Sequence, residues 1–398
     1  MAKILISSLG TGDIKKDSDS DYKETIYTID GKNYPNTLTS KVIIKHFEIE
    51  KVFFIGTSGS MWDNIYLKYD GEDEDYLDLL SNKKKNKTIS SNDLNKLEKQ
   101  IDTYLQSNGS RIFLIDYDKN DADEIWTNFE KLLEIATFLE DKDEIYLDIT
   151  HGFRYMPILN IFLLEFLSTL HKKDFEIKAI LYGMFADNTS QIIDFKIFFD
   201  LLNWIKAIND FKKSSNAEQL VILSKTVDED ASKVLLQFSQ NIQMANMFSL
   251  WSFMKNVSKK IKKLSQSDNK VIKLLSSEIM EIATRFDQKT QSSFQYELSK
   301  WLYENKNYAL SYIALYEAII TKICETKGYN ANVHKEREEA KKHIDHPYDQ
   351  YFLTKEENSI SQIRNSIVHQ NIDRKDVVMQ DIEKLGFFIE KFEDFFNL

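Results

Sequence analysis

The sequence is short of several things that would point to particular classes of protein. Its 398 residues include a single cysteine, Cys324, so no disulfide can form within the chain. This composition suits a reducing compartment, and we expect a cytoplasmic protein. No apolar run approaches the roughly 18 residues needed to cross a bilayer, so we expect no membrane partner. The apolar run at the N-terminus, about six residues long, is too short for a signal peptide.

Positive charge, and arginine in particular, is also limited. The formal net charge is −11, which argues against coating nucleic acid non-specifically but is compatible with a local basic channel. Only six arginines accompany 46 lysines. An arginine can bind phosphate through two parallel hydrogen bonds, which lysine cannot, so each arginine is a candidate functional residue. The length exceeds one ordinary core, and we expect two domains or three.

The first half of the chain, residues 1–195, alternates short β-rich runs with helical patterns. The runs are KILISSL, TIYTI, KVFFIG, RIFLID, EIYLDI, EIKAILYG and QIIDF. Continuous apolar runs between helices predict a mostly parallel sheet covered on both faces, a Rossmann-like α/β domain. Asp30-Gly31 predicts a hairpin appended near the first strand. The charged stretch over residues 69–93 predicts a solvated insertion, to which we assign no function.

The second half, residues 196–398, predicts an all-helical domain. Apolar residues recur three and four positions apart, as in FFDLLNWIKAI and DIEKLGFFIEKFEDFF. Proline is almost absent from this half, where only Pro347 interrupts the pattern.

Four polar turns follow four of the predicted strands. They are SLGTGD (8–13), GTSGSMW (56–62), DYDKND (116–121) and DITHGFR (148–154). In a doubly wound sheet, ligands bind beyond the carboxyl ends of the strands, so we expect these turns to form a binding site. Glycine lets the backbone approach a ligand, and N–H groups at the start of a helix favour an anion. His151 and Arg154 can bind phosphate or stack on a base.

Other interpretations of these turns stay open. Glycine- and serine-rich turns are ordinary connectors, and Asp148 can serve simply as a helix cap or Asx-turn. The glycine spacing does not match G-x-G-x-x-G, and no acidic residue stands where a ribose-binding one would. A nicotinamide-dependent dehydrogenase is therefore disfavoured.

A second stretch of interest, NSISQIRNSIVHQ, lies near the C-terminus. It places Arg364 five residues before His369, a rotation of about 140° around a helix. Both side chains can border one groove, especially where two copies of the helix face each other. Such a pair can cleave RNA without a metal, because arginine stabilises the charge of the phosphorane while histidine moves a proton. The 2′-hydroxyl attacks the adjacent phosphate and leaves a 2′,3′-cyclic phosphate.

Competing patterns in this half carry less weight. Arg337 and His343 repeat the arginine–histidine spacing loosely, but they lie in a charge run typical of a solvated helix face. His334, His343 and His346 do not complete a metal site, and we expect no metal. The lysine-rich segment 255–264 can guide RNA, but it is also typical of a solvated face.

The turn DITHGFRYMP resembles the DxTHG signature of a CRISPR-associated family whose N-terminal half is a CARF domain, a Rossmann-like sensor. All four fixed positions match, and GTSGSMW is similar to that family's second ligand loop. The resemblance implies a homodimer that binds a cyclic oligoadenylate across its two-fold axis, with four adenylates favoured over six. The residues implied to contact this ligand are Gly10, Thr11, Gly12, Thr57, Ser58, Gly59, Ser60, Met61, Trp62, Asp148, Thr150, His151 and Gly152. Arg154, just past the signature, is added for its charge.

RNSIVH resembles the signature of HEPN ribonucleases, in which an arginine and a polar residue precede a histidine. Joined to a DxTHG domain, it is similar to the CARF–HEPN effectors of type III CRISPR systems. This implies an α/β CARF sensor over 1–195 and an all-α HEPN domain over 196–398. The implied activity is metal-independent cleavage of single-stranded RNA, switched on allosterically by the cyclic ligand. Arg364, Asn365 and His369 are the implied catalytic residues.

Two alternatives stay open at this point. The helical half can be a non-catalytic regulatory module, in which case the protein only senses the nucleotide. The sensor domain can also degrade its own cyclic ligand, as a ring nuclease does.

Overall fold

The computed structural model describes residues 1–11, 25–117, 121–170, 174–186, 189–352, 359–369 and 378–397. The chain divides into two compact units, Met1–Phe199 and Asp200–Leu398. Helix α8 (Lys196–Ser214) begins in the first unit and continues into the second. Among the described residues, no helix has both the length and the apolar character that spanning a membrane demands.

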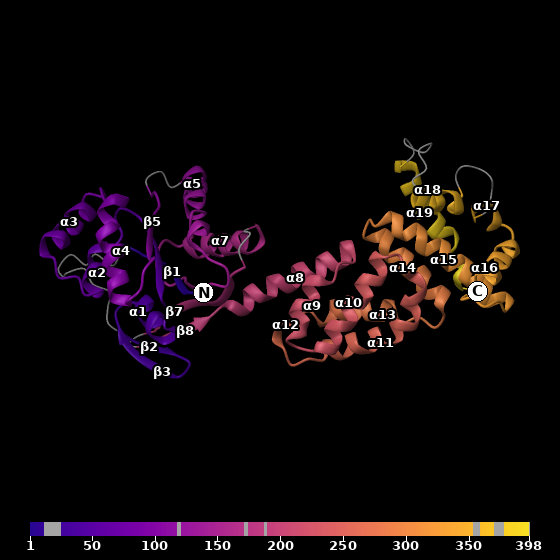
Figure 1. The fold of residues 1–398 in the computed structure, drawn as a ribbon, viewed down its shortest axis with the longest axis horizontal. Helices are drawn as coiled ribbons and strands as arrows, with labels where there is room; N and C mark the ends of the chain where they lie inside the picture. Colours follow the sequence, from indigo (N-terminus) through magenta and orange to yellow (C-terminus); the bar gives the residue numbers. More distant parts are fainter. Residues whose placement is uncertain are drawn as a thin grey trace. The chain divides into compact units, whose positions relative to one another are not determined.

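Unit 1 is built on one mixed sheet of eight strands (Figure 1). The order across the sheet is β3-β2-β8-β7-β6-β1-β4-β5. Strand β1 lies parallel to both β6 and β4, and β5 continues the parallel part beyond β4. The β2–β3 and β7–β8 pairs are antiparallel. The strands are β1 (Lys3–Ser8), β2 (Thr25–Ile29), β3 (Lys32–Asn36), β4 (Lys51–Gly56), β5 (Arg111–Leu114), β6 (Glu144–Asp148), β7 (Glu176–Ala186) and β8 (Thr189–Asp194).

Helices cover both faces of this sheet. Successive residues of β1 point to opposite faces: Leu5 joins one buried cluster, while Ile4 and Ile6 join the other. Helices α1, α2 and α4 close the first cluster, and α5, α6 and α7 close the second. The helices of unit 1 are α1 (Thr39–Phe47), α2 (Trp62–Lys68), α3 (Glu74–Lys85), α4 (Ser91–Leu105), α5 (Ala122–Leu132), α6 (Ile135–Phe138) and α7 (Met156–Leu170).

Two expectations for unit 1 need correction. The hairpin around Asp30-Gly31 forms, but it lies at the edge of the sheet beyond β8 rather than near β1. Both sides of β1 are already occupied by β4 and β6, so no position is open there. The charged stretch over residues 69–93 is not simply a solvated insertion, because it folds into α3 and the start of α4 and buries Leu80 completely.

The regular secondary structure of the described residues of unit 2 is entirely helical, as expected. Its helices after α8 are α9 (Glu218–Lys225), α10 (Glu229–Gln243), α11 (Met247–Ser265), α12 (Lys270–Leu274), α13 (Ser276–Arg285), α14 (Gln291–Glu304), α15 (Tyr308–Lys327), α16 (His334–Ala340), α17 (Asp349–Phe352), α18 (Ile360–His369), α19 (Val378–Lys391) and α20 (Glu393–Asn397). A short 3-10 turn, Lys341–His343, follows α16. The prediction of an α/β first half followed by a helical second half is therefore confirmed.

Helices α14 and α15 form the centre of unit 2. They contribute side chains to two apolar clusters, one shared with α8–α13 and one shared with α16–α20. Two buried serines let the helix backbones approach closely: Ser299 Oγ donates to the carbonyl of Ser311 at 3.0 Å, and Ser311 Oγ donates to that of Ser299 at 2.8 Å. Helix α18, which carries Arg364 and His369, packs against α15 through buried Ile360 and Ile363.

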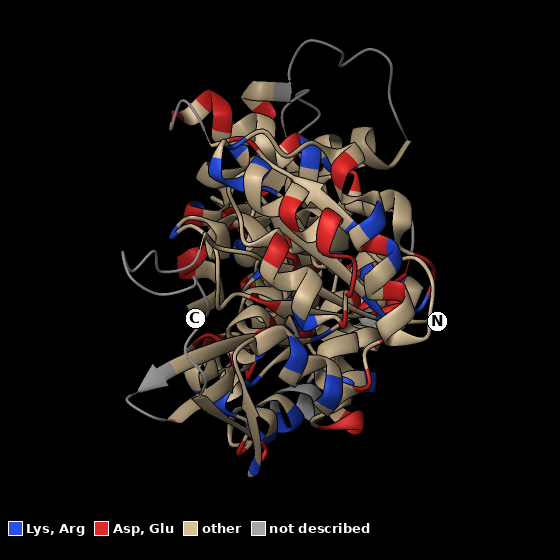
Figure 2. Cartoon of the chain, turned by 90° about the vertical axis from the view of Figure 1, so that its left-hand side faces the viewer, with Lys and Arg blue, Asp and Glu red and all other residues tan. Residues whose placement is uncertain are grey.

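Both signs of charge are interspersed along the helices in the view of Figure 2. Many of the charged side chains pair with a neighbour of opposite sign, as in Lys83–Asp93 at 2.6 Å and Lys262–Asp287 at 2.6 Å. A lysine that points into a concave site without such a pair is therefore informative.

Candidate functional site

The four polar turns follow four strands that are consecutive in the parallel part of the sheet. Strands β6, β1 and β4 lie side by side, and β5, which precedes the third turn, is next to β4. Parallel strands place their carboxyl ends at the same edge, so the described residues of all four turns lie along one edge of the sheet. β1 is also the position where the chain order reverses, since β4 lies on one side of it and β6 on the other.

The first two turns are joined by hydrogen bonds. Ser60 Oγ donates to the carbonyl of Leu9 at 3.0 Å, and the Met61 N–H donates to that of Gly10 at 3.2 Å. The Trp62 indole donates to the Thr57 carbonyl at 2.7 Å. Ser60, Met61 and Trp62 are buried, so they hold the shape of the turn rather than face outward.

The turn after β6 is fixed from within. Asp148 is fully buried; its carboxylate accepts from Ser7 Oγ at 2.9 Å and from the Thr150 N–H at 2.9 Å. Thr150 Oγ1 accepts from the Gly183 N–H at 2.8 Å. The side chains of Asp148 and Thr150 thus tie β6 to β1 and β7.

Gly152 has a conformation and a position that both favour glycine. Its φ is +104°, and a Cβ added there would lie 3.0 Å from Ser8 Cβ. The turn therefore packs directly on the end of β1. Arg154, two residues on, is exposed.

His151 is held against α1 in the same turn. Its Nε2 lies 3.4 Å from Thr39 Oγ1. Burial lowers the pKa of His151 below its ordinary value of 6.5, and the negative charge of Asp148 partly opposes this shift. The imidazole is accordingly neutral near pH 7 and can donate or accept a hydrogen bond.

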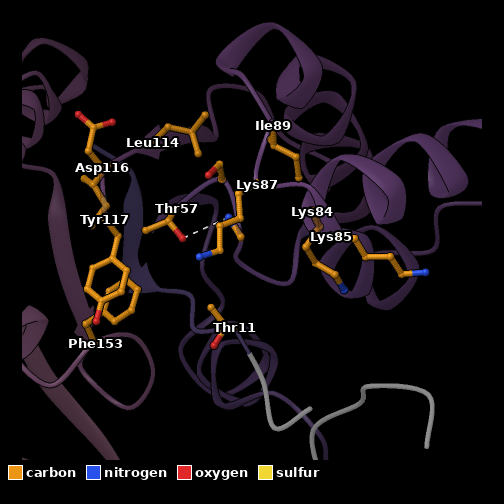
Figure 3. Close-up of a pocket in the computed structure, with 13 residues that line it drawn as sticks. Thr11, Thr57, Lys84, Lys85, Lys87, Ile89, Leu114, Asp116, Tyr117 and Phe153 are labelled. Carbon is orange, nitrogen blue, oxygen red and sulfur yellow. Dashed lines mark hydrogen bonds between the residues drawn. The ribbon is translucent and has the colours of Figure 1, made fainter. Parts of the chain in front are cut away.

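A cavity of about 490 Å³ opens between the second and third turns (Figure 3). Its lining residues are Thr11, Thr57, Ser58, Gly59, Lys84, Lys85, Lys87, Ile89, Leu114, Ile115, Asp116, Tyr117 and Phe153. On one side, Tyr117 stacks on Phe153, with ring centroids 3.7 Å apart and an angle of 15° between the ring planes. The ring of Tyr155 is nearly parallel to that of Phe153, with a distance of 5.9 Å between their centroids. On the other side stand the three lysines.

The cavity includes some of the residues expected at the ligand and leaves others out. Thr11, Thr57, Ser58 and Gly59 line it. Gly12 lies outside the described residues. The remaining expected contacts are not among its lining residues: they are Gly10, Ser60, Met61, Trp62, Asp148, Thr150, His151, Gly152 and Arg154.

The other nine lining residues were not expected to contact a ligand. Among them, Lys84, Lys85 and Lys87 belong to the insertion that was expected to be solvated, and Tyr117 and Phe153 lie within the third and fourth turns. The run KKKNK at the end of α3 was the available signal, but its position against the turn after β4 depends on tertiary packing.

In unit 2, Arg364 points back onto α15. Its guanidinium lies 4.8 Å from the centre of the Tyr316 ring and 4.0 Å from Glu317, and its Nη1 donates to Asn365 Oδ1 at 3.1 Å. Its Nε has no hydrogen-bond partner among the described residues. His369 is exposed and is the last residue of α18.

Glu317 connects both arginine–histidine pairs of the sequence. It forms an ion pair with Arg337 through one carboxylate oxygen and lies near Arg364 through the other. Arg337 also donates to Thr321 Oγ1 at 3.5 Å, so its role is in packing α16 on α15 rather than on a solvated face. His343 is engaged with the Tyr329 hydroxyl at 3.2 Å.

The constraint on Gly152 leads to a stability prediction. Gly152→Ala should lower the free energy of unfolding of unit 1 by about 1–3 kcal/mol, because the new Cβ adds a clash to an unfavourable φ. Gly31→Ala is the matched control, since Gly31 has φ +74° but open space around it, and it should cost only about 1 kcal/mol. Denaturant unfolding of both variants measures the difference. Equal losses would show that the turn moves aside without cost.

The lowered pKa of His151 leads to a pH prediction. As the pH falls through 6.5, the unfolded chain protonates this imidazole while the folded one resists, so the free energy of unfolding of unit 1 falls. The contribution of one such proton is at most about 1.4 kcal/mol per pH unit. Denaturant unfolding at pH 7.5 and 5.5 should show a smaller loss in His151→Gln than in the unaltered protein. The same loss in both would contradict the assignment.

Comparison with known proteins found two families that match parts of this chain. Residues 4–186 match the family described as CRISPR system endoribonuclease Csx1, CARF domain. Residues 200–293 match the family described as CRISPR-associated protein MJ1674, second domain. Arg364 and His369 lie beyond both matched ranges.

One relative extends the similarity along most of the chain. CRISPR-associated protein MJ1674 of Methanocaldococcus jannaschii is 30% identical over 408 residues, which cover 94% of this chain and 63% of the relative. The chain thus spans less than two thirds of that relative's length. The N-terminal unit is thus similar to a CARF domain over residues 4–186, and the chain as a whole is similar to a CRISPR-associated protein, with a mostly helical C-terminal part.

Proposed function

We propose that the protein is a type III CRISPR effector in which a cyclic oligoadenylate bound to the CARF domain activates a metal-independent ribonuclease in the helical unit. The observation that carries the first part is the cavity at the carboxyl edge of the CARF sheet. It combines hydroxyls and backbone amides of the Thr57–Gly59 turn with lysines and a stacked aromatic pair. These groups suit the phosphates and bases of a nucleotide ligand.

The ring size follows from the DxTHG resemblance, which favours cyclic tetra-adenylate over cyclic hexa-adenylate. Such a ring is large and symmetric, so it exceeds one cavity of about 490 Å³ and can contact two copies of the domain at once. The turn from Asp148 to Gly152 would then contribute through His151 and backbone groups, since Asp148 and Thr150 are hydrogen-bonded within the protein.

A second copy of the chain is the proposed occupant of an apolar groove between α5 and α7. The groove has a volume of about 590 Å³, and its walls include Trp126, Phe162 and Leu170, which are 63%, 60% and 65% exposed. A contiguous exposed apolar patch of this kind marks an interaction surface. Helix α7 begins four residues after Gly152, so a partner packed here meets the same edge that carries the candidate ligand turns.

In the helical unit, the proposed reaction uses Arg364 and His369. The ribose 2′-hydroxyl gives its proton to water, and its oxygen forms a bond to the adjacent phosphorus as the bond from phosphorus to the 5′-oxygen breaks. Arg364 stabilises the charge of the phosphorane, and His369 transfers a proton to the departing 5′-oxygen. Asn365 accepts a hydrogen bond from Arg364 and is assigned to orienting it. The name of the matched CARF family, that of an endoribonuclease, supports the proposal.

Activation requires the ligand to favour one arrangement of the helical units over another. Arg364 rests on Tyr316 and near Glu317, which already carries the charge of Arg337. A change in the contact between two copies of α18 that draws Arg364 toward RNA would complete the site. Under this proposal, the resting contacts of Arg364 keep activity low until the ligand binds.

Cleavage of a fluorogenic single-stranded RNA tests the proposed reaction. We expect cleavage only with cyclic tetra-adenylate present, and expect it to persist in EDTA. His369→Ala should lower the rate by about 10²–10⁴-fold, the usual contribution of a positioned acid or base, without changing ligand binding. His334→Ala is the matched control, because this histidine is 87% exposed and the ion pair that it forms among the described residues is a long one, with Glu338 of its own helix at 4.0 Å.

Several outcomes of that assay would contradict the proposal. Ligand-independent cleavage, loss of cleavage on chelation, or full activity of His369→Ala would each do so. Ligand binding without any RNA cleavage would favour the non-catalytic sensor. The appearance of linear oligoadenylates from the ring would show the additional ring-nuclease activity.

The proposed dimer surface has its own test. Phe162→Asp places a charge in the apolar groove and should convert the dimer to monomer in sedimentation velocity at micromolar concentration. Leu67→Asp is the matched control, since Leu67 is 50% exposed on α2 and lies outside the groove. A Phe162→Asp protein that still sediments as a dimer would place the interface elsewhere.

A further inference from the structure

We propose that Lys85 and Lys87, from the insertion between α2 and β5, hold a phosphate of the nucleotide ligand, so that the cavity seats one nucleoside phosphate unit. This inference rests on the proposed function and assigns residues that neither the motif resemblance nor the strand turns include.

The lysine segment is held in place on both sides. Leu80 of α3 and Ile89, just before α4, are buried in the core that α1, α2 and α4 cover. Lys84 forms an ion pair with Asp63 of α2, whose carboxylate also accepts from Ser81 Oγ at 3.0 Å. The end of α3 is therefore fastened to α2, directly beyond the turn after β4.

Lys87 is placed over that turn. Its backbone φ of +53° reverses the chain after α3. The stem of its side chain lies across Gly59, with Lys87 Cγ 3.7 Å from the position that a Cβ on Gly59 would take. Figure 3 shows Lys87 beside Thr57, with Lys84 and Lys85 on the same side of the cavity. An anion against the Thr57–Gly59 turn would thus meet Lys87 as well.

The charged residues around the cavity differ in whether they form an ion pair with a neighbour. Lys83 and Lys84 are paired with Asp93 and Asp63. Within the described ranges, neither Lys85 nor Lys87 has a carboxylate within 4.0 Å, and both are exposed. On the opposite wall Asp116 is paired with Lys131 at 2.6 Å, which reduces its repulsion of an anion. Among the described residues, the lining of the cavity therefore includes two lysines without a carboxylate partner, while its other charged side chains are paired.

The far wall gives the second half of a nucleotide site. The Tyr117 ring is 39% exposed and stacks on Phe153, so its outer face can carry a flat base. Leu114 and Ile115 add apolar surface beneath. The volume of about 490 Å³ is within the range of about 300–1,000 Å³ typical of small-molecule sites. A phosphate at the lysines and a base at Tyr117 would together fill both walls.

Binding of cyclic tetra-adenylate to the full-length protein tests this assignment. The double variant Lys85→Met/Lys87→Met keeps the side-chain stems but removes both charges. Its Kd should rise at least about tenfold, the usual size of a lost charge-assisted hydrogen bond. Lys85→Arg/Lys87→Arg should retain most of the affinity. Tyr117→Ala should weaken binding at least about fivefold through lost stacking.

Lys32→Met/Lys99→Met is the matched control, because both lysines are exposed on unit 1 and neither lines the cavity. It removes the same charge and should bind normally. Thermal unfolding of every variant checks that it is folded. Competition by inorganic phosphate alone, with no effect of Tyr117→Ala, would show an anion site without a base and would overturn the nucleotide assignment.

The two levels of the proposal fail differently. If the unaltered protein binds cyclic tetra-adenylate and the Lys85/Lys87 double variant binds it equally well, the lysine assignment is wrong and the proposed function stands. If the unaltered protein binds no cyclic oligoadenylate, the proposed function is wrong and the lysine assignment is overturned with it.

Discussion

The hydrogen bond between Ser7 and the fully buried Asp148 is the contact on which the candidate ligand edge depends. It joins the ends of β1 and β6, the two strands between which the chain order reverses. A buried carboxylate is costly unless its oxygens are hydrogen-bonded, and here one oxygen takes the Ser7 hydroxyl and the other the Thr150 N–H. The same carboxylate therefore sets both the spacing of the strands and the conformation of the turn. Gly152, packed on Ser8, completes this arrangement.

Several residues expected to contact the ligand therefore shape the turns instead of facing outward. Asp148 and Thr150 hold the turn, and Ser60, Met61 and Trp62 hold its neighbour after β4. Groups that can meet a ligand directly come from the outer surface of these turns and from segments beyond them. The residues that support the turns can therefore be buried and rigid, while the residues that contact a ligand remain accessible.

In the helical unit, the single residue Glu317 likewise contacts side chains of two other helices. One carboxylate on α15 faces both Arg337 of α16 and Arg364 of α18. This half-buried carboxylate of α15 therefore lies against the helix that carries the proposed nuclease residues. Because Arg364 already has an aromatic ring and a carboxylate beside it, a change that moves α18 would alter its surroundings directly.

Much of this arrangement could be predicted from the sequence, for identifiable reasons. Continuous apolar runs such as KILISSL and KVFFIG are buried on both faces, so the parallel sheet and its polar edge followed from their order. The position of the hairpin could not be predicted, because it depends on which sheet edges remain open after β4 and β6 flank β1. That Lys85 and Lys87 line the cavity could not be predicted either, because their sequence is typical of a solvated helix end. Glu317 has no local motif, and only tertiary packing brings it to Arg364.

The central claim of the proposed function is that a ligand bound at the carboxyl edge of the sheet controls the helical unit. It is tested most directly by measuring, on the same samples, the fraction of protein bound to cyclic tetra-adenylate and the rate of RNA cleavage as the ligand is titrated. The account predicts that the rate rises from near zero in step with occupancy and reaches its plateau at saturation. A cleavage rate that stays constant while the sites fill would contradict it.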